Sequence, residues 1–205
     1  MTEVYLDELI QKSELANPWD YQYWKGLKNR RILLMGTIES SVAEEVMIPL
    51  LDMDDGSGRE IEIIVDSDGG DVIALFNLIN ILDNIKTPVH IRVLSKCCSA
   101  ALLLLLGGKS NPMVRVTCNA NTVGLVHAGS TTLGTMDSNA ANDVMNFFKR
   151  YETKTKELIL KRTKVDSKLY AKMAKKEWYM FGDELLKYGF VDALENHAEG
   201  GEVDD

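Results

Sequence analysis

Ser99 stands where an apolar helix is expected to begin, a position that suits a nucleophile. Residues 96–101 read KCCSAA and run into the apolar segment 100–108. A hydroxyl in the first turn of a helix lies near the positive end of the helix dipole, and the next amide, that of Ala100, can donate to an oxyanion. A serine there is also a common helix N-cap, so its position alone leaves both roles open.

Two glycines predict a second part of such a site. Residues 65–71 read VDSDGGD and link a predicted buried strand to a predicted helix. Gly69 and Gly70 let the backbone turn tightly and expose its N–H groups, so this loop can supply half of an oxyanion hole. Glycines between a strand and a helix are also common as plain turns.

One of the three histidines is the candidate general base. His127 ends an apolar strand and is followed by Ala-Gly, an arrangement that presents a side chain at a strand edge. His90 lies within a predicted strand and His197 lies in the acidic tail, so His127 is chosen by elimination. A histidine without a catalytic partner is more often structural. The prediction that His127 is a general base therefore depends on its pairing with Ser99.

The elements that must position these residues alternate along the chain. The predicted strands are 32–36, 61–65, 89–93, 113–118, 122–127 and 190–194, and the predicted helices are 42–51, 71–85, 137–161 and 182–188. This order predicts an α/β fold with parallel strands joined by crossover helices. The helix at 137–161, about seven turns long, exceeds what covering a sheet requires and indicates oligomerisation.

Composition and charge exclude several classes of function. The net charge of −8 disfavours a nucleic-acid partner, because phosphate backbones recruit clustered lysine and arginine. Cys97, Cys98 and Cys118 show no CxxC spacing, which suits a reducing cytosol. The acidic N-terminus lacks the features of a secretory signal, and the apolar run 100–108 is about half the length that spans a bilayer. We expect a cytoplasmic protein without membrane contact.

Three segments are predicted. Residues 1–26 form an N-terminal arm with four aromatic side chains near its end, which fits a docking arm as well as any other function. Residues 27–194 form one domain, large enough to bury a core without disulfides or metals. Residues 195–205 form an acidic tail expected to be disordered.

These residues together resemble the proteolytic subunit family of the Clp protease. The similarity runs from KNRRILL at 28–34 to YGFVD at 188–192 and includes ANDV at 141–144. It implies that Ser99 is the nucleophile and His127 the general base. It also implies that the amides of Gly70 and Ala100 form the oxyanion hole.

The resemblance implies a fold and partners as well. The family has the crotonase-like fold of repeated ββα units with a long protruding handle helix, and two stacked heptameric rings enclose a proteolytic chamber. A hexameric AAA+ unfoldase threads unfolded polypeptides into that chamber, and ATP binds to the unfoldase, so no cofactor is expected in this chain. The long helix would interlock the two rings.

The sequence departs from the family pattern at several positions. Glu177 stands where the family has the aspartate that orients the base, and Asp183 is the second candidate for that role. Asp68 replaces a proline and Ala101 a glycine, while Ala-Gly at 128–129 replaces Gln-Pro. Residues 1–26 match poorly. These departures indicate a divergent branch.

We predict an ATP-dependent Clp-type serine endopeptidase that hydrolyses unfolded proteins. The alternative is a catalytically impaired structural ring subunit that assembles with an active paralogue, which Glu177 suggests. A third interpretation keeps the fold but stabilises acyl-CoA enolates, because crotonase-like domains also do this. A Ser–Lys dyad between Lys96 and Ser99 is a further alternative.

Overall fold

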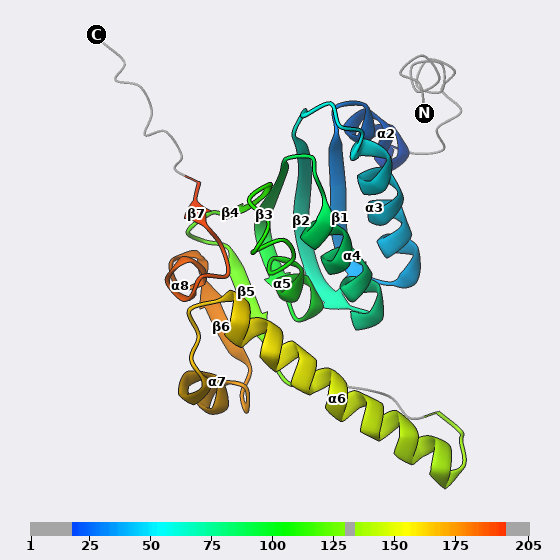
Figure 1. The fold of residues 1–205 in the computed structure, drawn as a ribbon, viewed down its shortest axis with the longest axis vertical. Helices are drawn as coiled ribbons and strands as arrows, with labels where there is room; N and C mark the ends of the chain where they lie inside the picture. The colour runs from blue at the N-terminus through cyan, green and yellow to red at the C-terminus, as the bar shows by residue number, and fades with distance from the viewer. Residues whose placement is uncertain (1–17, 130–133, 196–205) are drawn as a thin grey trace.

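The structure, a computed structural model, describes residues 18–129 and 134–195. The predicted α/β order is confirmed (Figure 1). The elements are α2 Pro18–Lys28, β1 Arg31–Ile38, α3 Ser40–Met53, β2 Ile61–Gly70, α4 Val72–Asn84, β3 Val89–Cys98, α5 Ala100–Leu104, β4 Val114–Cys118, β5 Val123–Val126, α6 Ser138–Arg162, α7 Ser167–Met173, β6 Trp178–Phe181, α8 Gly182–Tyr188 and β7 Ala193–Leu194. Among the described helices, none is both long enough and apolar enough to cross a bilayer.

The described strands form a single sheet. Its central strand, β3, pairs with two different strands along the same edge, β4 first and then β5. The main order is β1-β2-β3-β4-β7, and all of these neighbours are parallel. The first half of β3 pairs with β4, whereas Lys96, Cys97 and Cys98 pair with β5. Strand β6 then pairs antiparallel with β5. The sheet therefore splits toward the carboxyl end of β3, which is where Ser99 follows.

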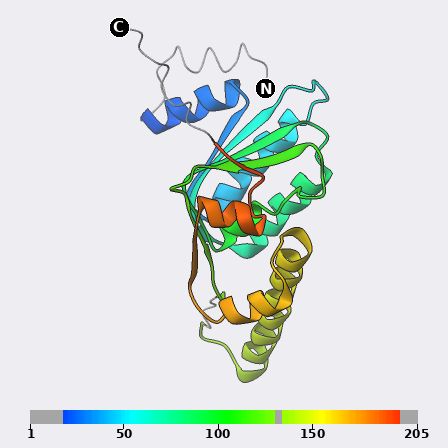
Figure 2. The same cartoon turned by 90° about the vertical axis from the view of Figure 1, so that its left-hand side faces the viewer.

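The core lies between the sheet and the helices α3, α4 and α5, which cover one of its faces (Figures 1 and 2). Burial alternates along the first half of β2, as the period-2 pattern of a strand requires, and Ile61, Ile63 and Val65 are buried. Helix α4 packs its buried side chains Leu75, Leu78 and Leu82 within the same cluster. Each such side chain contributes about 1.5–3 kcal/mol by leaving water.

Helix α6 projects from the rest of the molecule (Figures 1 and 2). It begins at the N-cap Asp137, whose carboxylate accepts hydrogen bonds from the amides of Asn139 and Ala140. Of its 25 residues only Ile159 is buried, and Phe147 is 55% exposed. The predicted helix 137–161 is thus confirmed, and most of its surface lies outside the core of this chain.

Two predictions about the strands were wrong. The stretch 65–71 was expected to be a loop, but β2 continues to Gly70 because Ile38 of β1 pairs with it. The expected strand 190–194 is reduced to Ala193–Leu194, because the amides of Phe190 and Val191 still bond to the carbonyl of Leu185 in α8. The glycines therefore pair with β1 just after an irregularity in the register, and both have positive φ, 96° at Gly69 and 148° at Gly70.

The predicted segment boundaries are crossed by ordered contacts. Helix α2 runs across the expected boundary at residue 26, and the Tyr23 hydroxyl donates to the carbonyl of Glu45. At the other end, Glu195 makes two hydrogen bonds to Arg92 and accepts one from Thr117. Glu195 is therefore fixed to the sheet. Residues 1–17 and 196–205, the rest of the predicted arm and tail, lie outside the described residues.

We expect Glu195→Gln to destabilise the fold by about 1–2 kcal/mol at pH 7, the size of a charge-assisted pair in a partly exposed position. Its hydrogen bonds with Arg92 and Thr117 lower the pKa of Glu195 to about 2. A carboxyl group whose pKa is lowered in the folded state stabilises the fold at every pH above its pKa in the unfolded state, which is near 4.5. That contribution is lost as the pH falls toward 2.

Urea denaturation at several pH values measures this effect. The difference between wild type and Glu195→Gln should be full at pH 7 and shrink steadily below pH 4.5. Glu157→Gln is the control, because Glu157 makes only an exposed pair with Lys154. If the difference in the free energy of unfolding between wild type and Glu195→Gln stayed constant down to pH 3, the lowered pKa of Glu195 would be contradicted.

Candidate active site

The carboxyl ends of two neighbouring strands, β3 and β5, bring Ser99 and His127 together. Ser99 follows β3 and His127 follows β5, and these two strands pair in parallel up to Cys98 and Leu125. The amide of Ser99 continues the ladder with a 2.8 Å hydrogen bond to the carbonyl of Leu125. Residues that follow paired parallel strands lie at the same edge of the sheet. The register therefore places Ser99 beside His127.

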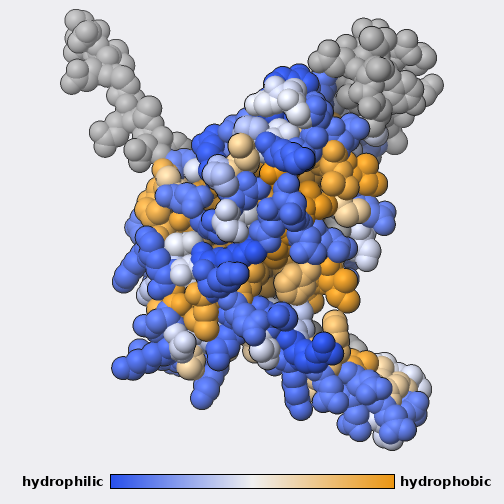
Figure 3. Space-filling view, viewed as in Figure 1, coloured by the Kyte–Doolittle hydropathy of each residue, from blue (hydrophilic) through white to orange (hydrophobic). Residues whose placement is uncertain are grey.

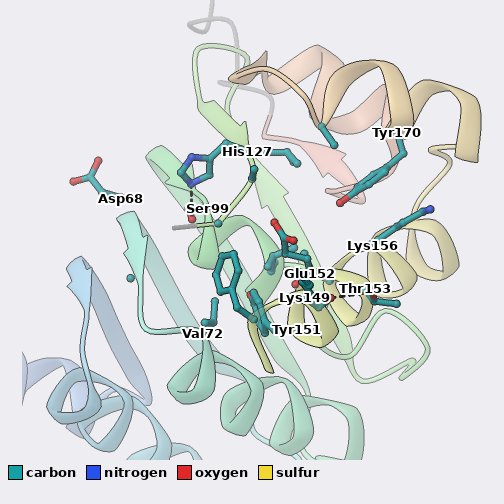
Figure 4. Close-up of a pocket in the computed structure, with 18 residues that line it drawn as sticks. Asp68, Val72, Ser99, His127, Lys149, Tyr151, Glu152, Thr153, Lys156 and Tyr170 are labelled. Carbon is teal, nitrogen blue, oxygen red and sulfur yellow. Dashed lines mark hydrogen bonds between the residues drawn. The ribbon is translucent and has the colours of Figure 1, made fainter. Parts of the chain in front are cut away.

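Ser99 and His127 are in direct contact. The Ser99 Oγ lies 2.8 Å from Nε2 of His127, in a partly buried position (Figure 4). When the imidazole is neutral and carries its proton on Nδ1, Nε2 accepts the hydrogen bond from the hydroxyl. This is the arrangement in which a histidine can remove the proton of a serine as the oxygen attacks.

The backbone of Ser99 adopts a conformation that few side chains tolerate. Its φ is 54° and its ψ is −121°, and Arg30 is the one other non-glycine residue with positive φ in the described ranges. Such a residue costs about 1–3 kcal/mol and persists where the surroundings enforce it. Ser99 was predicted within the first helical turn but is the N-cap of α5, without a side-chain capping bond. Its hydroxyl contacts His127 instead.

The amide of Ala100, one of the two predicted oxyanion donors, lies directly after Ser99 at the start of α5. Ala100 is the first residue of α5, where amides have no acceptor within the helix. A Cβ atom placed on Gly69 would lie 2.9 Å from this amide nitrogen and 2.8 Å from Cβ of Ser99. Only a glycine at position 69 therefore allows the backbone of β2 to approach the turn at Ser99 this closely. Gly70, the other predicted donor, lines the same cleft as Ser99.

Gly69→Ala should both destabilise the fold and damage this site. The added Cβ would lie 2.5 Å from the Cys98 carbonyl oxygen, and the φ of 96° is unfavourable for alanine. We expect a loss of about 2–4 kcal/mol in the free energy of unfolding.

Gly56→Ala is the matched control for this variant. Gly56 also has positive φ, at 74°, but an added Cβ meets nothing within 4 Å. It should cost about 1 kcal/mol from the backbone conformation alone. Urea denaturation of both variants separates the two effects, and equal losses would show that the contact with the Ser99 turn does not matter.

Of the two candidate orienting carboxylates, the structure brings only Glu177 to His127. Strand β6 runs antiparallel to β5, with Trp178 opposite Val126, so Glu177 comes level with His127. Its Oε1 lies 3.5 Å from Nδ1 of the histidine, and its side chain is 58% exposed. Asp183 follows the far end of β6, beyond Phe181, which pairs with Val123. The hypothesis that Asp183 orients the base is therefore not supported.

The nearby lysine is engaged by another carboxylate. The Nζ of Lys96 lies 2.7 Å from both carboxylate oxygens of Asp68. This hydrogen bond raises the pKa of Lys96, which keeps the amine protonated and unsuited to remove a proton from Ser99. The Ser–Lys alternative is thus disfavoured. Within the described ranges no three His, Cys, Asp or Glu side chains gather as a metal site would require.

Ser99 and His127 open into a cleft of 650 Å³ (Figure 4). Part of its wall was not foreseen from the sequence, because it comes from α6 and α7. Tyr151, Glu152 and Lys156 of α6 and Tyr170 of α7 line it. The sequence signal was weak, since polar residues in a long amphipathic helix are usually solvent-exposed.

Comparisons with known proteins are consistent with this geometry. Residues 15–198 match the family model described as Clp protease. The chain is 26% identical over 180 residues to an ATP-dependent Clp protease proteolytic subunit of Streptococcus mutans, covering 86% of this chain and 90% of that protein. It is 27% identical over 188 residues to an ATP-dependent Clp protease proteolytic subunit 2 of Treponema denticola, covering 90% of each.

Proposed function

The chain belongs to the Clp protease family, and we propose that it is a serine endopeptidase acting as a proteolytic subunit. The observation that carries the proposal is the 2.8 Å contact between Ser99 Oγ and His127 Nε2. The strained backbone of Ser99 and its place directly before the first amide of α5 add support. A serine placed in this way suits acyl transfer rather than enolate chemistry on acyl-CoA, which has no use for a nucleophile.

The proposed reaction proceeds in two steps. Ser99 Oγ attacks the scissile carbonyl while His127 Nε2 takes its proton, and the amides of Ala100 and Gly70 stabilise the oxyanion. His127 then gives the proton to the leaving amine, and an ester remains on Ser99. Water, deprotonated by the same imidazole, hydrolyses this ester. Glu177 keeps the Nδ1 proton of His127 in place throughout.

We further propose that the active form is a homo-oligomer of two stacked heptameric rings. Helix α6 supports this, because it extends beyond the core with Phe147 exposed. Exposed Ile48 and Leu51 of α3 and Ile73 of α4 contribute to an apolar surface visible in Figure 3. Such a surface on a single subunit is typical of a contact with another chain.

The natural substrates in this proposal are unfolded polypeptides. The relatives are named ATP-dependent, which supports a partner AAA+ unfoldase that supplies the ATPase activity. We place the protein in the cytoplasm, and its three cysteines, all free and buried, support a reducing compartment.

The second candidate function is a structural ring subunit with impaired catalysis. The specific observation in its favour is the exposed Glu177, whose carboxylate stands 3.5 Å from His127. A loosely held base lowers the rate without affecting assembly. The contact between Ser99 and His127 favours the active peptidase.

A fluorophosphonate probe tests the proposal, because only an activated serine reacts rapidly with it. The purified assembled protein is treated with the probe, and the adduct is located by peptide mass spectrometry. We expect the adduct on Ser99 and its loss in His127→Ala. An assembled particle without an adduct would support the structural subunit instead.

A further inference from the structure

The cleft beside Ser99 is lined by both apolar and charged side chains. Val72, Leu103 and Val126 are among the apolar ones, and Asp68, whose carboxylate is paired with Lys96, also lines it. Glu152 and the phenol of Tyr170 form another part of the lining (Figure 4). The carboxylate of Glu152 lies between Ser99 and Tyr170 in this view.

Packing against α4 holds the part of α6 that carries Glu152 in place. Tyr151, the residue before Glu152, contacts Phe76 of α4 edge-to-face with ring centroids 5.7 Å apart. Its ring also lies 6.3 Å from that of Phe148, which lines the cleft too. This part of α6 is therefore fixed against α4, and Glu152 is directed into the cleft by the helix rather than by a loop.

The Glu152 carboxylate is available for a ligand. Its side chain is partly buried, and it forms no ion pair within 4.0 Å among the residues that the structure describes. Two lysines also line the cleft, but both are exposed. The Nζ of Lys156 lies 6.0 Å from the ring centroid of Tyr170 and extends away from Ser99 in Figure 4. Lys149 lies one turn before Glu152 on the same helix.

From this arrangement we infer that Glu152 is a specificity residue that selects peptides with lysine or arginine next to the scissile carbonyl. This inference rests on the proposed peptidase function. Lysine and arginine combine an apolar stem with a cationic tip, which matches a cleft that offers apolar side chains together with a carboxylate and a phenol. A leucine side chain would contact the apolar lining but leave Glu152 without a partner.

Matched fluorogenic peptides test the inference on the assembled protein. They differ only in the residue before the cleaved bond, which is lysine, arginine, norleucine or glutamate. Norleucine has nearly the lysine stem without the charge. We expect kcat/KM for lysine and arginine to exceed that for norleucine about five- to tenfold, as one partly buried ion pair provides.

Three variants separate charge from shape. Glu152→Gln should bring the lysine-to-norleucine ratio close to one by slowing the lysine peptide alone, and Glu152→Lys should favour the glutamate peptide. Glu157→Gln, on the same helix but outside the cleft, should leave every ratio unchanged. An unchanged ratio in Glu152→Gln, or a wild type that prefers norleucine, would overturn the inference.

The failure of the peptidase proposal is distinguishable from the failure of this inference. If no peptide is cleaved and no phosphonate labels Ser99, both are rejected. If Ser99 is labelled but peptides are not cleaved, the labelling rates of phosphonates with a lysine or a norleucine side chain replace kcat/KM. Equal rates for the two reagents would then reject the specificity role alone.

Discussion

Ser99→Ala should lower kcat/KM for peptide hydrolysis by at least about 10³-fold, because it removes the hydroxyl that His127 contacts and that would form the acyl intermediate. The hydroxyl makes its contact with His127 and does not cap α5. The free energy of unfolding should therefore change by less than about 1 kcal/mol. Fluorogenic peptide hydrolysis, urea denaturation and sedimentation of the same preparation measure activity, stability and assembly together.

Ser95→Ala is the matched control for this experiment. Ser95 is also in β3, but it is exposed and its hydroxyl bonds to Asp66 rather than facing the cleft. It should keep wild-type activity. Full activity of Ser99→Ala would refute the nucleophile. A wild type that assembles but is as inactive as the variant would favour the structural subunit.

Residue patterns along the chain predicted most of the elements and the Ser–His pair, but not α7 or β6, the strand that positions Glu177. The spacing of apolar residues distinguishes strands from helices. It alternates in β2, whose burial alternates too, and it forms one apolar stripe along α4. Ser99 and His127 each follow a strand, and parallel strands bring such positions to one edge. Elimination among the histidines and the family resemblance gave the prediction of this pair, and the parallel register of β3 and β5 explains why the two side chains meet.

Features that depend on pairing between distant strands were not predictable in the same way. Gly69 and Gly70 were predicted to form a turn, because the sequence does not show that β1 extends far enough to pair with Gly70. Glu177 and Asp183 were both open as partners of His127 until the antiparallel register of β5 and β6 separated them. Glu152 is inconspicuous in α6, and its direction depends on how that helix packs on α4.

Glu177→Gln should lower kcat by about 10²- to 10⁴-fold while KM changes less than twofold, because the carboxylate acts on the imidazole and not on the substrate. Glutamine keeps the size of the side chain but can no longer stabilise the imidazolium that forms as Ser99 attacks. The lower end of the range is expected. The 3.5 Å separation and the 58% exposure of Glu177 weaken its hold on His127.

Asp183→Asn provides the comparison that makes this result decisive, because it removes the other candidate carboxylate. Asp183 lies beyond the far end of β6, so its loss should leave kcat unchanged. If Asp183→Asn is slow and Glu177→Gln is not, the register argument fails and Asp183 is the orienting residue. If neither variant is slow, His127 acts without a carboxylate partner, and the exposed position of Glu177 reflects a role outside catalysis.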